Sequence, residues 1–373
     1  MSSQAISVTP ELSETTSKPR IPSLDGLRAI SIFLVVIGHA SLSFPHSGKW
    51  VNFFLQIFGN SDAGVLIFFV ISGFLITTLL LQEFEKTGSI RLSNFYLRRS
   101  FRIFPAFYCY MGVVFFLWMA GNIHLTWPIF GTAAMFLRNY GSLFIHSSPT
   151  GDWFVGHTWT LAVEEQFYWL WPICLIAVKP RRAILIAAVL IALAPVLRTS
   201  EYFIFKAGRE QIPILLHTRM DSLMTGALAA LLYKNKRFQG LLNLLYKKKA
   251  PLFSALFIFG LSPLIAGHFH GIYLLPVGWT LENFATVIIL LWAIDYSRSR
   301  IGICLNSRLL VHVGVISYSL YLWQQLFLTN LSPFPLAKFP FNIVLAIMAA
   351  EISYFAIERP ILVWRRKRKL IPL

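Results

Sequence analysis

The chain has 373 residues, of which 56% are hydrophobic and only 13% are charged. Soluble domains usually carry about 25% charged residues, so this composition excludes a soluble globular protein and indicates one that crosses a membrane several times. The formal net charge of +17 would suit a nucleic-acid-binding protein only if it formed a basic face on a soluble module.

Ten apolar runs are long enough to cross a membrane, which takes roughly 17–25 mostly apolar residues. The weakest is the sixth, because it is short and contains Arg219 and Asp221. The sequence therefore predicts an all-α polytopic membrane protein with about ten transmembrane helices. The predicted spans lie at 25–44, 62–82, 103–120, 158–178, 183–199, 218–233, 251–267, 277–294, 309–330 and 340–357.

The basic residues are distributed unevenly between the loops. If the N- and C-termini are both cytoplasmic, only seven of the 33 Lys and Arg residues fall on the outer side. This bias follows the positive-inside rule and explains the high net charge without nucleic acid. The same topology explains the final RRKRK, which would also suit an anionic lipid surface. The seven outer residues are Lys49, Arg138, Arg198, Lys206, Arg209, Arg219 and Lys338.

The chain is predicted to hold one integral-membrane domain at 21–360, with a disordered cytoplasmic tail at 1–20 and a basic cytoplasmic tail at 361–373. The segment 121–157 is apolar but interrupted, which indicates a re-entrant or interfacial piece on the outer side. No metal site and no permanently bound cofactor are predicted, because the three cysteines lack the spacing of metal ligands. They are Cys109, Cys174 and Cys304.

The first span, LDGLRAISIFLVVIGHA, contains Arg28 and His39, and each costs about 2.5–3.5 kcal/mol within a membrane. They are eleven residues apart, which is close to three helical turns and about 16 Å of rise. Both are therefore expected to point toward the same neighbour, Arg28 near the inner surface and His39 in the outer half. The alternative is that Arg28 is only a positive-inside anchor and His39 only a packing hydrogen-bond partner.

The fourth span, GHTWTLAVEEQFYWLWP, brings in a second polar set. Glu164 and Glu165 lie about two turns into it, and His157 lies at its mouth. Adjacent carboxylates point about 100° apart, so only one of them can share a given contact. One glutamate either pairs with a base for structural reasons or orients a catalytic imidazole. The depth of Glu164 makes a pairing with His39 feasible.

Arginines cluster in NFYLRRSFRIFP, between the second and third spans. Arg98 and Arg102 are four residues apart and share a helical face, with Arg99 beside them. The cluster reads either as a stop-transfer signal or as a clamp for a phosphate-bearing ligand, because guanidinium groups suit phosphates. Arg219 and Asp221 in TRMDSLMTG either pair with each other or face a cavity.

Several motifs follow in order over nearly the whole chain and together resemble the membrane acyltransferase 3 family, whose bacterial members O-acylate sugars and other hydroxyl acceptors. An Arg, ten residues and a His in the first span form the family hallmark, which Arg28 and His39 match. The inferred length resembles the form without a fused extracytoplasmic esterase-like domain. The other motifs are FFVISGFLIT, YLRRSFRIFP, HTWTLAVEEQFYWLWP, RMDSLMTG, GVISYSLYLW and IERP.

The resemblance implies that cytoplasmic acyl-CoA, most often acetyl-CoA, is the donor. It also assigns functional weight to Arg28, His39, Glu164 and the Arg98/Arg99/Arg102 cluster. Family members often read YSLYLWH where this chain reads YSLYLWQQ, so Gln324 is expected to form hydrogen bonds rather than to transfer protons. The predicted acceptor-binding or supporting residues are Asp25, His157, Trp159, Glu165, Tyr168, Arg219, Asp221, Tyr318 and Gln324.

Together these patterns predict an O-acyltransferase of the bacterial cytoplasmic (inner) membrane. The arginines would hold CoA phosphates, His39 would act as general base or nucleophile, and Glu164 would set its tautomer. Trp153, Trp159 and Tyr168 would either bind a sugar or form an interfacial aromatic belt. The acceptor is expected to be a carbohydrate or lipid-linked glycan, such as O-antigen, exopolysaccharide or peptidoglycan. The transfer is either direct or relayed across the membrane.

Two other functions remain open from the sequence. A transporter or flippase for a glycan or lipid-linked precursor would line its path with buried charges, but discontinuous helices and repeated halves are not evident. A lipid-linked glycosyltransferase would need an acidic metal-binding pair at a loop, and no such pair stands out among the 16 acidic residues.

Overall fold

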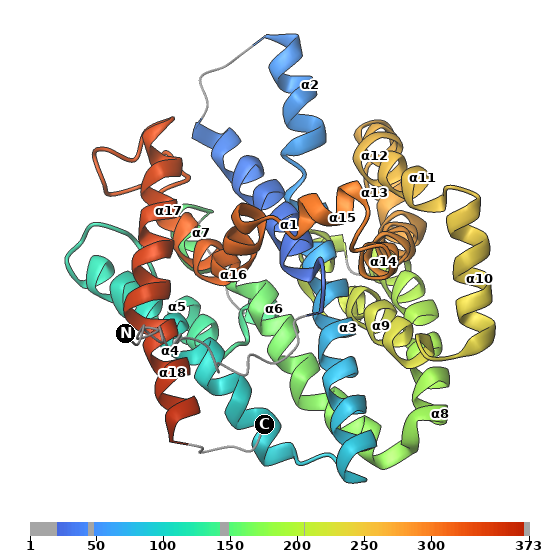
Figure 1. The fold of residues 1–373 in the computed structure, drawn as a ribbon. Coiled ribbons are helices and arrows are strands. Elements are labelled where there is room, and N and C mark those ends of the chain that lie inside the picture. Colours follow the sequence, from blue (N-terminus) through green and yellow to red (C-terminus); the bar gives the residue numbers. More distant parts are fainter. Residues whose placement is uncertain (1–20, 44–47, 142–148, 205, 369–373) are drawn as a thin grey trace, which may run out of the picture.

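The computed structural model describes residues 21–43, 48–141, 149–204 and 206–368, and the predicted 1–20 tail lies outside them. The described residues form helices and no strand (Figure 1). In chain order the elements are α1 (Leu24–Ala40), η1 (Ser41–Ser43), α2 (Lys49–Phe58), α3 (Ser61–Thr87), α4 (Leu92–Met119), α5 (Trp127–Ala134), α6 (Arg138–Gly141), α7 (Pro149–Gly156), α8 (Thr158–Ile204), η2 (Lys206–Ile214), α9 (Leu216–Leu232), α10 (Lys236–Lys247), α11 (Ala250–Leu256), η3 (Phe257–Leu261), α12 (Ser262–Phe269), α13 (Gly271–Tyr273), η4 (Leu274–Gly278), α14 (Trp279–Asp295), α15 (Arg300–Leu305), α16 (Arg308–Trp323), η5 (Gln324–Leu326), α17 (Phe341–Ser353), η6 (Tyr354–Glu358) and α18 (Arg359–Lys367).

Eight helical segments of the described chain are long and apolar enough to cross a membrane. The other two predicted spans are also helices, but they are shorter: α9 has 17 residues and α16 has 16. The prediction of an all-α polytopic membrane protein is confirmed. The eight segments are Leu24–Ser43, Ser61–Thr87, Leu92–Met119, Trp153–Val178, Arg181–Ile204, Ala250–Phe269, Gly271–Asp295 and Phe341–Lys367.

Helix α8 contains two of the predicted spans in one helical stretch of 47 residues. The sequence predicts a loop at KPRR between them, but helical backbone continues through this segment. A proline inside a helix removes a hydrogen bond and favours a sharp bend. The ribbon of α8 turns back at its lower end in Figure 1, so its two parts form separate spans.

The interrupted segment at 121–157 contains only the short helices α5, α6 and α7, and residues 142–148 lie outside the described chain. None of these helices exceeds eight residues, so none can cross the bilayer. At the other end of the chain, helix continues through η6 and α18 to Lys367. It therefore includes part of the segment predicted as a basic tail.

Glycines allow two pairs of helices to approach so closely that their backbones are in contact. A Cβ atom added to Gly73 of α3 would lie 1.9 Å from the carbonyl oxygen of Leu223 in α9, and one at Gly226 of α9 would lie 2.0 Å from that of Val70. At the contact between α1 and α16, a Cβ atom on Gly314 would lie 1.9 Å from the Asp25 carbonyl oxygen. Small residues favour this kind of packing in membranes because they bring backbones into contact.

Candidate active site

Five helices, α1, α3, α4, α8 and α16, surround a pocket between their side chains. It has an empty volume of about 750 Å³, counted with its opening. Apolar residues from α3 line much of the wall, and polar side chains converge from all five helices. The polar lining residues are Arg28, Ser72, Arg99, Arg102, Thr160, Glu164, Tyr168, Ser317, Tyr318 and Tyr321.

Three guanidinium groups meet in this pocket. Arg99 and Arg102 are three residues apart on α4 and so share a helix face, while Arg28 comes from α1 and lies 3.9 Å from Asp25. The Nε of Arg99 is buried without a hydrogen-bond partner, and Arg102 lines the same pocket. Because Glu164 is the only carboxylate among the described residues that line the pocket, the lining carries excess positive charge and suits an anion with several oxygens.

Glu164 belongs to this arginine pocket. Its Oε1 accepts a hydrogen bond from the Ser72 hydroxyl at 2.5 Å. The neighbouring Glu165 is buried and lies 4.0 Å from Arg99. The two adjacent carboxylates therefore both lie near the arginines, although only Glu164 lines the pocket.

His39 lies outside the pocket lining and has a different partner from the one expected. Its Nδ1 is 3.0 Å from Oε1 and 2.7 Å from Nε2 of Gln324, and its ring meets the edge of Trp153 at 5.5 Å. The predicted pairing of His39 with Glu164 is therefore corrected. Depth along two helices cannot determine which way they face, and Glu164 faces the arginine pocket.

Two other predicted residues of the α8 entrance are packed among aromatic rings. His157 is buried between Tyr110 and Tyr321, with ring centroids at 5.5 and 5.4 Å, and its backbone carbonyl accepts a hydrogen bond from the Tyr321 hydroxyl. Trp159 meets Phe69 edge-on at 6.0 Å. Neither lines the arginine pocket, and their predicted acceptor role stays a prediction.

Two residues predicted to bind the acceptor or to support the site lie at the pocket, whereas one arginine of the predicted cluster does not. Tyr168 and Tyr318 both line the pocket, and the Tyr318 hydroxyl donates to the Ile103 carbonyl at 2.8 Å. Arg98 does not line it, because its guanidinium pairs with Glu83 at 2.7 Å. The predicted cluster is therefore corrected: Arg99 and Arg102 share the pocket, and Arg98 points elsewhere.

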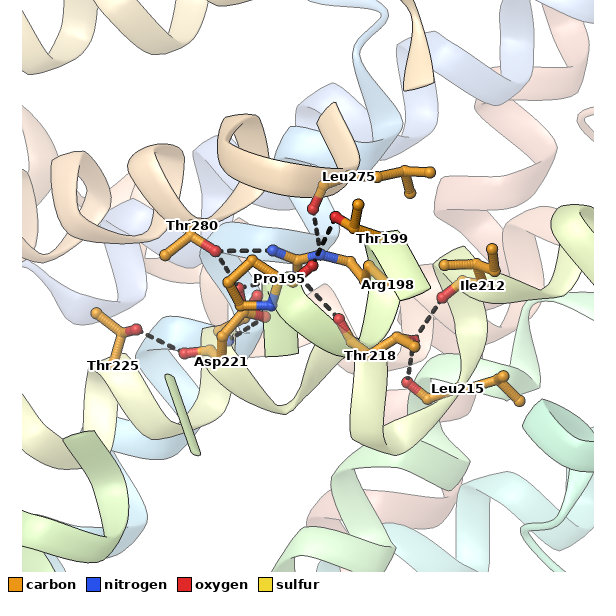
Figure 2. Close-up of polar contacts among 11 residues, drawn as sticks. Pro195, Arg198, Thr199, Ile212, Leu215, Thr218, Asp221, Thr225, Leu275 and Thr280 are labelled. Carbon is orange, nitrogen blue, oxygen red and sulfur yellow. Dashed lines mark hydrogen bonds and ion pairs between the residues drawn. The ribbon is translucent and has the colours of Figure 1, made fainter. Parts of the chain in front are cut away.

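A second buried network lies among α8, α9 and α14 (Figure 2). Arg198 and Asp221 form a fully buried ion pair at 2.9 Å, and Thr280 bonds to both of them. Arg198 also donates to the carbonyls of Thr218 and Leu275. With its guanidinium so fully bonded, this network reads as structural.

Arg219 does not pair with Asp221, which answers the question left open by the sequence. Its guanidinium lies over the ring of Trp279, 4.3 Å from the centroid. Its Nε and Nη1 are buried without a hydrogen-bond partner. Arg219 does not line the arginine pocket, so Arg219 and Asp221 both lie outside it.

Sequence reasoning missed several residues of these clusters. Ser72 lies within FFVISGFLIT, where a hydroxyl in an apolar span is a weak signal, and Gln325 directly follows Gln324. Arg198 was visible as a single charge at the end of an apolar run. Within the described residues no group of three or more His, Cys, Asp or Glu side chains is arranged to hold a metal ion.

The chain is similar to known proteins over most of its length. Residues 21–355 match the acyltransferase 3 family, described as an acyltransferase domain. The chain belongs to this acyltransferase family. It is similar to the O-acetyltransferase OatA of Staphylococcus aureus (strain NCTC 8325 / PS 47), with 30% identity over 372 aligned residues covering 93% of this chain. It is 28% identical, over 92% of its length, to the peptidoglycan O-acetyltransferase OatA of Listeria monocytogenes.

Both relatives are longer than the aligned region. The matched part covers 58% of the Staphylococcus protein and 56% of the Listeria protein. No solved structure matches the chain significantly.

Proposed function

We propose that the protein is an O-acyltransferase of the bacterial cytoplasmic membrane. It moves an acyl group, with acetyl as the first candidate, from acyl-CoA to a hydroxyl of a carbohydrate. The observation that carries the proposal is the convergence of Arg28, Arg99 and Arg102 in one pocket of a chain that belongs to an acyltransferase family. Burying three guanidinium groups in a lining that holds a single carboxylate is costly unless an anion binds there.

The donor would bind with its phosphates at the arginines. Guanidinium groups form paired, charge-assisted hydrogen bonds with phosphate oxygens. The pantetheine arm of CoA would then extend along α1 toward His39, which lies eleven residues, or about 16 Å of helix rise, beyond Arg28. A flexible arm carrying a thioester suits this separation of the binding and reacting groups.

The reaction would take place at His39. As general base, the imidazole removes the proton of an acceptor hydroxyl while the oxygen attacks the thioester carbonyl. The C–S bond breaks, and the CoA thiolate leaves and takes up the proton. As nucleophile, the imidazole first accepts the acyl group and then passes it to the hydroxyl. Both routes need one free imidazole nitrogen facing the thioester.

The acceptor class is drawn from the relatives. The Listeria relative is named for peptidoglycan, so the sugars of peptidoglycan are the first acceptor to test. O-antigen, exopolysaccharide and lipid-linked glycans carry the same kind of hydroxyl and make up the comparison set. The arginine pocket itself concerns the donor and does not distinguish among them.

The test is an assay of CoA release from acetyl-CoA by the purified protein, with and without each glycan. An O-acyltransferase releases CoA in proportion to the acetyl ester formed on the glycan, as followed by mass spectrometry. A transporter or flippase, the alternative function, releases none. Absence of CoA release with every glycan, by folded protein in a lipid bilayer, would refute the proposal.

A further inference from the structure

The side chain that holds His39 is an amide, and its surroundings fix which way it points. We propose that Gln324 is the positioning residue of His39, offering Nδ1 both a donor and an acceptor so that Nε2 is the reacting nitrogen. This inference rests on the proposed function, because it assigns the nitrogen through which His39 would act.

The orientation of Gln324 follows from Gln325 and Trp153. The Nε2 of Gln325 donates to the backbone carbonyl of Trp153 at 2.8 Å, and the Trp153 indole donates to the backbone carbonyl of Gln325 at 2.9 Å. A carbonyl oxygen only accepts, so the Oε1 of Gln325 must face the other way. There it meets the Nε2 of Gln324 at 3.4 Å. The amide nitrogen of Gln324 is therefore the atom on the Gln325 side.

Both amide atoms of Gln324 are within reach of the same imidazole nitrogen. Nε2 lies 2.7 Å and Oε1 lies 3.0 Å from Nδ1 of His39. An unprotonated Nδ1 can accept from the amide N–H, and a protonated Nδ1 can donate to the amide oxygen. Nδ1 is thus partnered in every protonation state of the ring, without rotation of the glutamine.

The other ring nitrogen remains available. Among the described residues, none forms a hydrogen bond with Nε2 of His39. The glutamine pair is fully enclosed, with Gln324 0% and Gln325 3% exposed. The Gln324 amide is buried and hydrogen-bonded to both Gln325 and His39, so it keeps its position. It therefore orients the imidazole with Nε2 toward the reactants.

An amide partner suits a histidine whose protonation state changes during the reaction. When Nε2 takes the proton of an acceptor hydroxyl, the ring becomes imidazolium and Nδ1–H donates to Oε1. When Nε2 instead bonds to the acyl carbon and the CoA thiolate leaves with the Nδ1 proton, Nδ1 accepts from the amide N–H. A carboxylate partner would serve only the first of these states, because it has no proton to donate.

Three variants test the role, in the assay of CoA release and acetyl ester described above. Gln324→Leu removes both hydrogen bonds at similar volume, so kcat should fall about 10–100-fold, the range found for hydrogen-bond partners of metal-ligating histidines. The KM for acetyl-CoA should stay within about twofold, because the arginine pocket is intact. Gln324→Glu introduces a carboxylate beside the imidazole, and opposite charges favour the charged form. The acidic limb of its pH–rate profile should move to higher pH by about one unit.

Gln166→Leu is the matched control, because Gln166 is also a hydrogen-bonded glutamine, bonded to Asn139 and the Phe136 carbonyl. It lines no part of the arginine pocket, and its pH–rate profile should match the wild type. An unshifted acidic limb in Gln324→Glu, or an unchanged kcat in Gln324→Leu, would overturn the positioning role while the wild type stays active. Absence of CoA release by the wild type itself would instead refute the proposed function.

Discussion

The guanidinium of Arg99 lies over the ring of Tyr168, with its central carbon 3.7 Å from the ring centroid. Its Nη2 lies 4.0 Å from a carboxylate oxygen of Glu165. An aromatic face and a carboxylate thus hold the cation from two sides. Arg99 is therefore positioned in advance for an anion entering the pocket.

We expect Arg99→Ala and Arg102→Ala to weaken donor binding more than they slow the chemistry. A hydrogen bond to a charged group contributes about 1.5–3 kcal/mol, which corresponds to a rise in the KM for acetyl-CoA of about 10–100-fold. Initial-rate kinetics on purified protein measure the effect. Arg98→Ala is the matched comparison, because Arg98 pairs with Glu83 outside the pocket. An equal rise in KM for that variant would contradict the assignment of the pocket.

We expect His39→Ala to lower acyl transfer by about 10²–10⁴-fold, the usual contribution of a positioned acid or base. Binding of acetyl-CoA should remain near the wild-type value, since His39 does not line the arginine pocket. Calorimetric titration with CoA checks the binding, and the mass-spectrometric assay checks the transfer. Full activity in a folded His39→Ala protein would remove His39 from the mechanism.

Asp221→Ala should destabilise the fold. Removing one partner of a buried ion pair leaves the other charge unpaired and costs about 3–5 kcal/mol. The pair of Arg198 and Asp221 is fully buried, so thermal unfolding in detergent should begin at a clearly lower temperature. The double variant Arg198→Met/Asp221→Leu should recover most of the loss, because it removes both charges. A double variant no more stable than Asp221→Ala would argue against an ion-pair origin.

Gly73→Ala should separate α3 from α9. The added methyl group would lie 1.9 Å from the Leu223 carbonyl oxygen, and overpacking of this kind costs about 1–3 kcal/mol. Gly112 of α4 is the control, since a Cβ atom there has no neighbour within 4 Å. Gly112→Ala should be neutral or stabilising by up to about 1 kcal/mol, because alanine favours helix. Thermal unfolding of the two variants side by side decides the matter.

Hydropathy was enough to predict most of the helical segments, and helix period predicted that Arg28 and His39 share a face, which stays a prediction. The partners of these residues were not predictable in the same way. His39 and Gln324 are 285 positions apart, and no spacing rule connects residues on helices so distant in the chain. Depth alone made a pairing of Glu164 with His39 feasible, and the rotation of α8 instead directs Glu164 to Ser72.

The arginine cluster shows the same limit within a single helix. Arg98 and Arg102, four apart, and Arg99 and Arg102, three apart, are both plausible pairs on one face. The choice between them depends on which side of α4 faces its neighbours. The Glu83 carboxylate draws Arg98 away, and that contact joins two different helices.

The backbone contact between Gly314 and Asp25 has a consequence for donor selection. It locks α1 to α16 near Arg28, and these two helices also carry the far end of the path, since α1 holds His39 and α16 leads directly into Gln324. Arg28 and His39 both lie on α1, so under the proposed function the phosphate site and the reacting imidazole stay about 16 Å of helix rise apart, and the contact with α16 keeps Gln324 beside that imidazole. Acetyl phosphate would bind at the arginines, but its acetyl group would then lie too far from His39 to react. The enzyme would thus distinguish donors by how far they extend, before any contact with the acyl group itself.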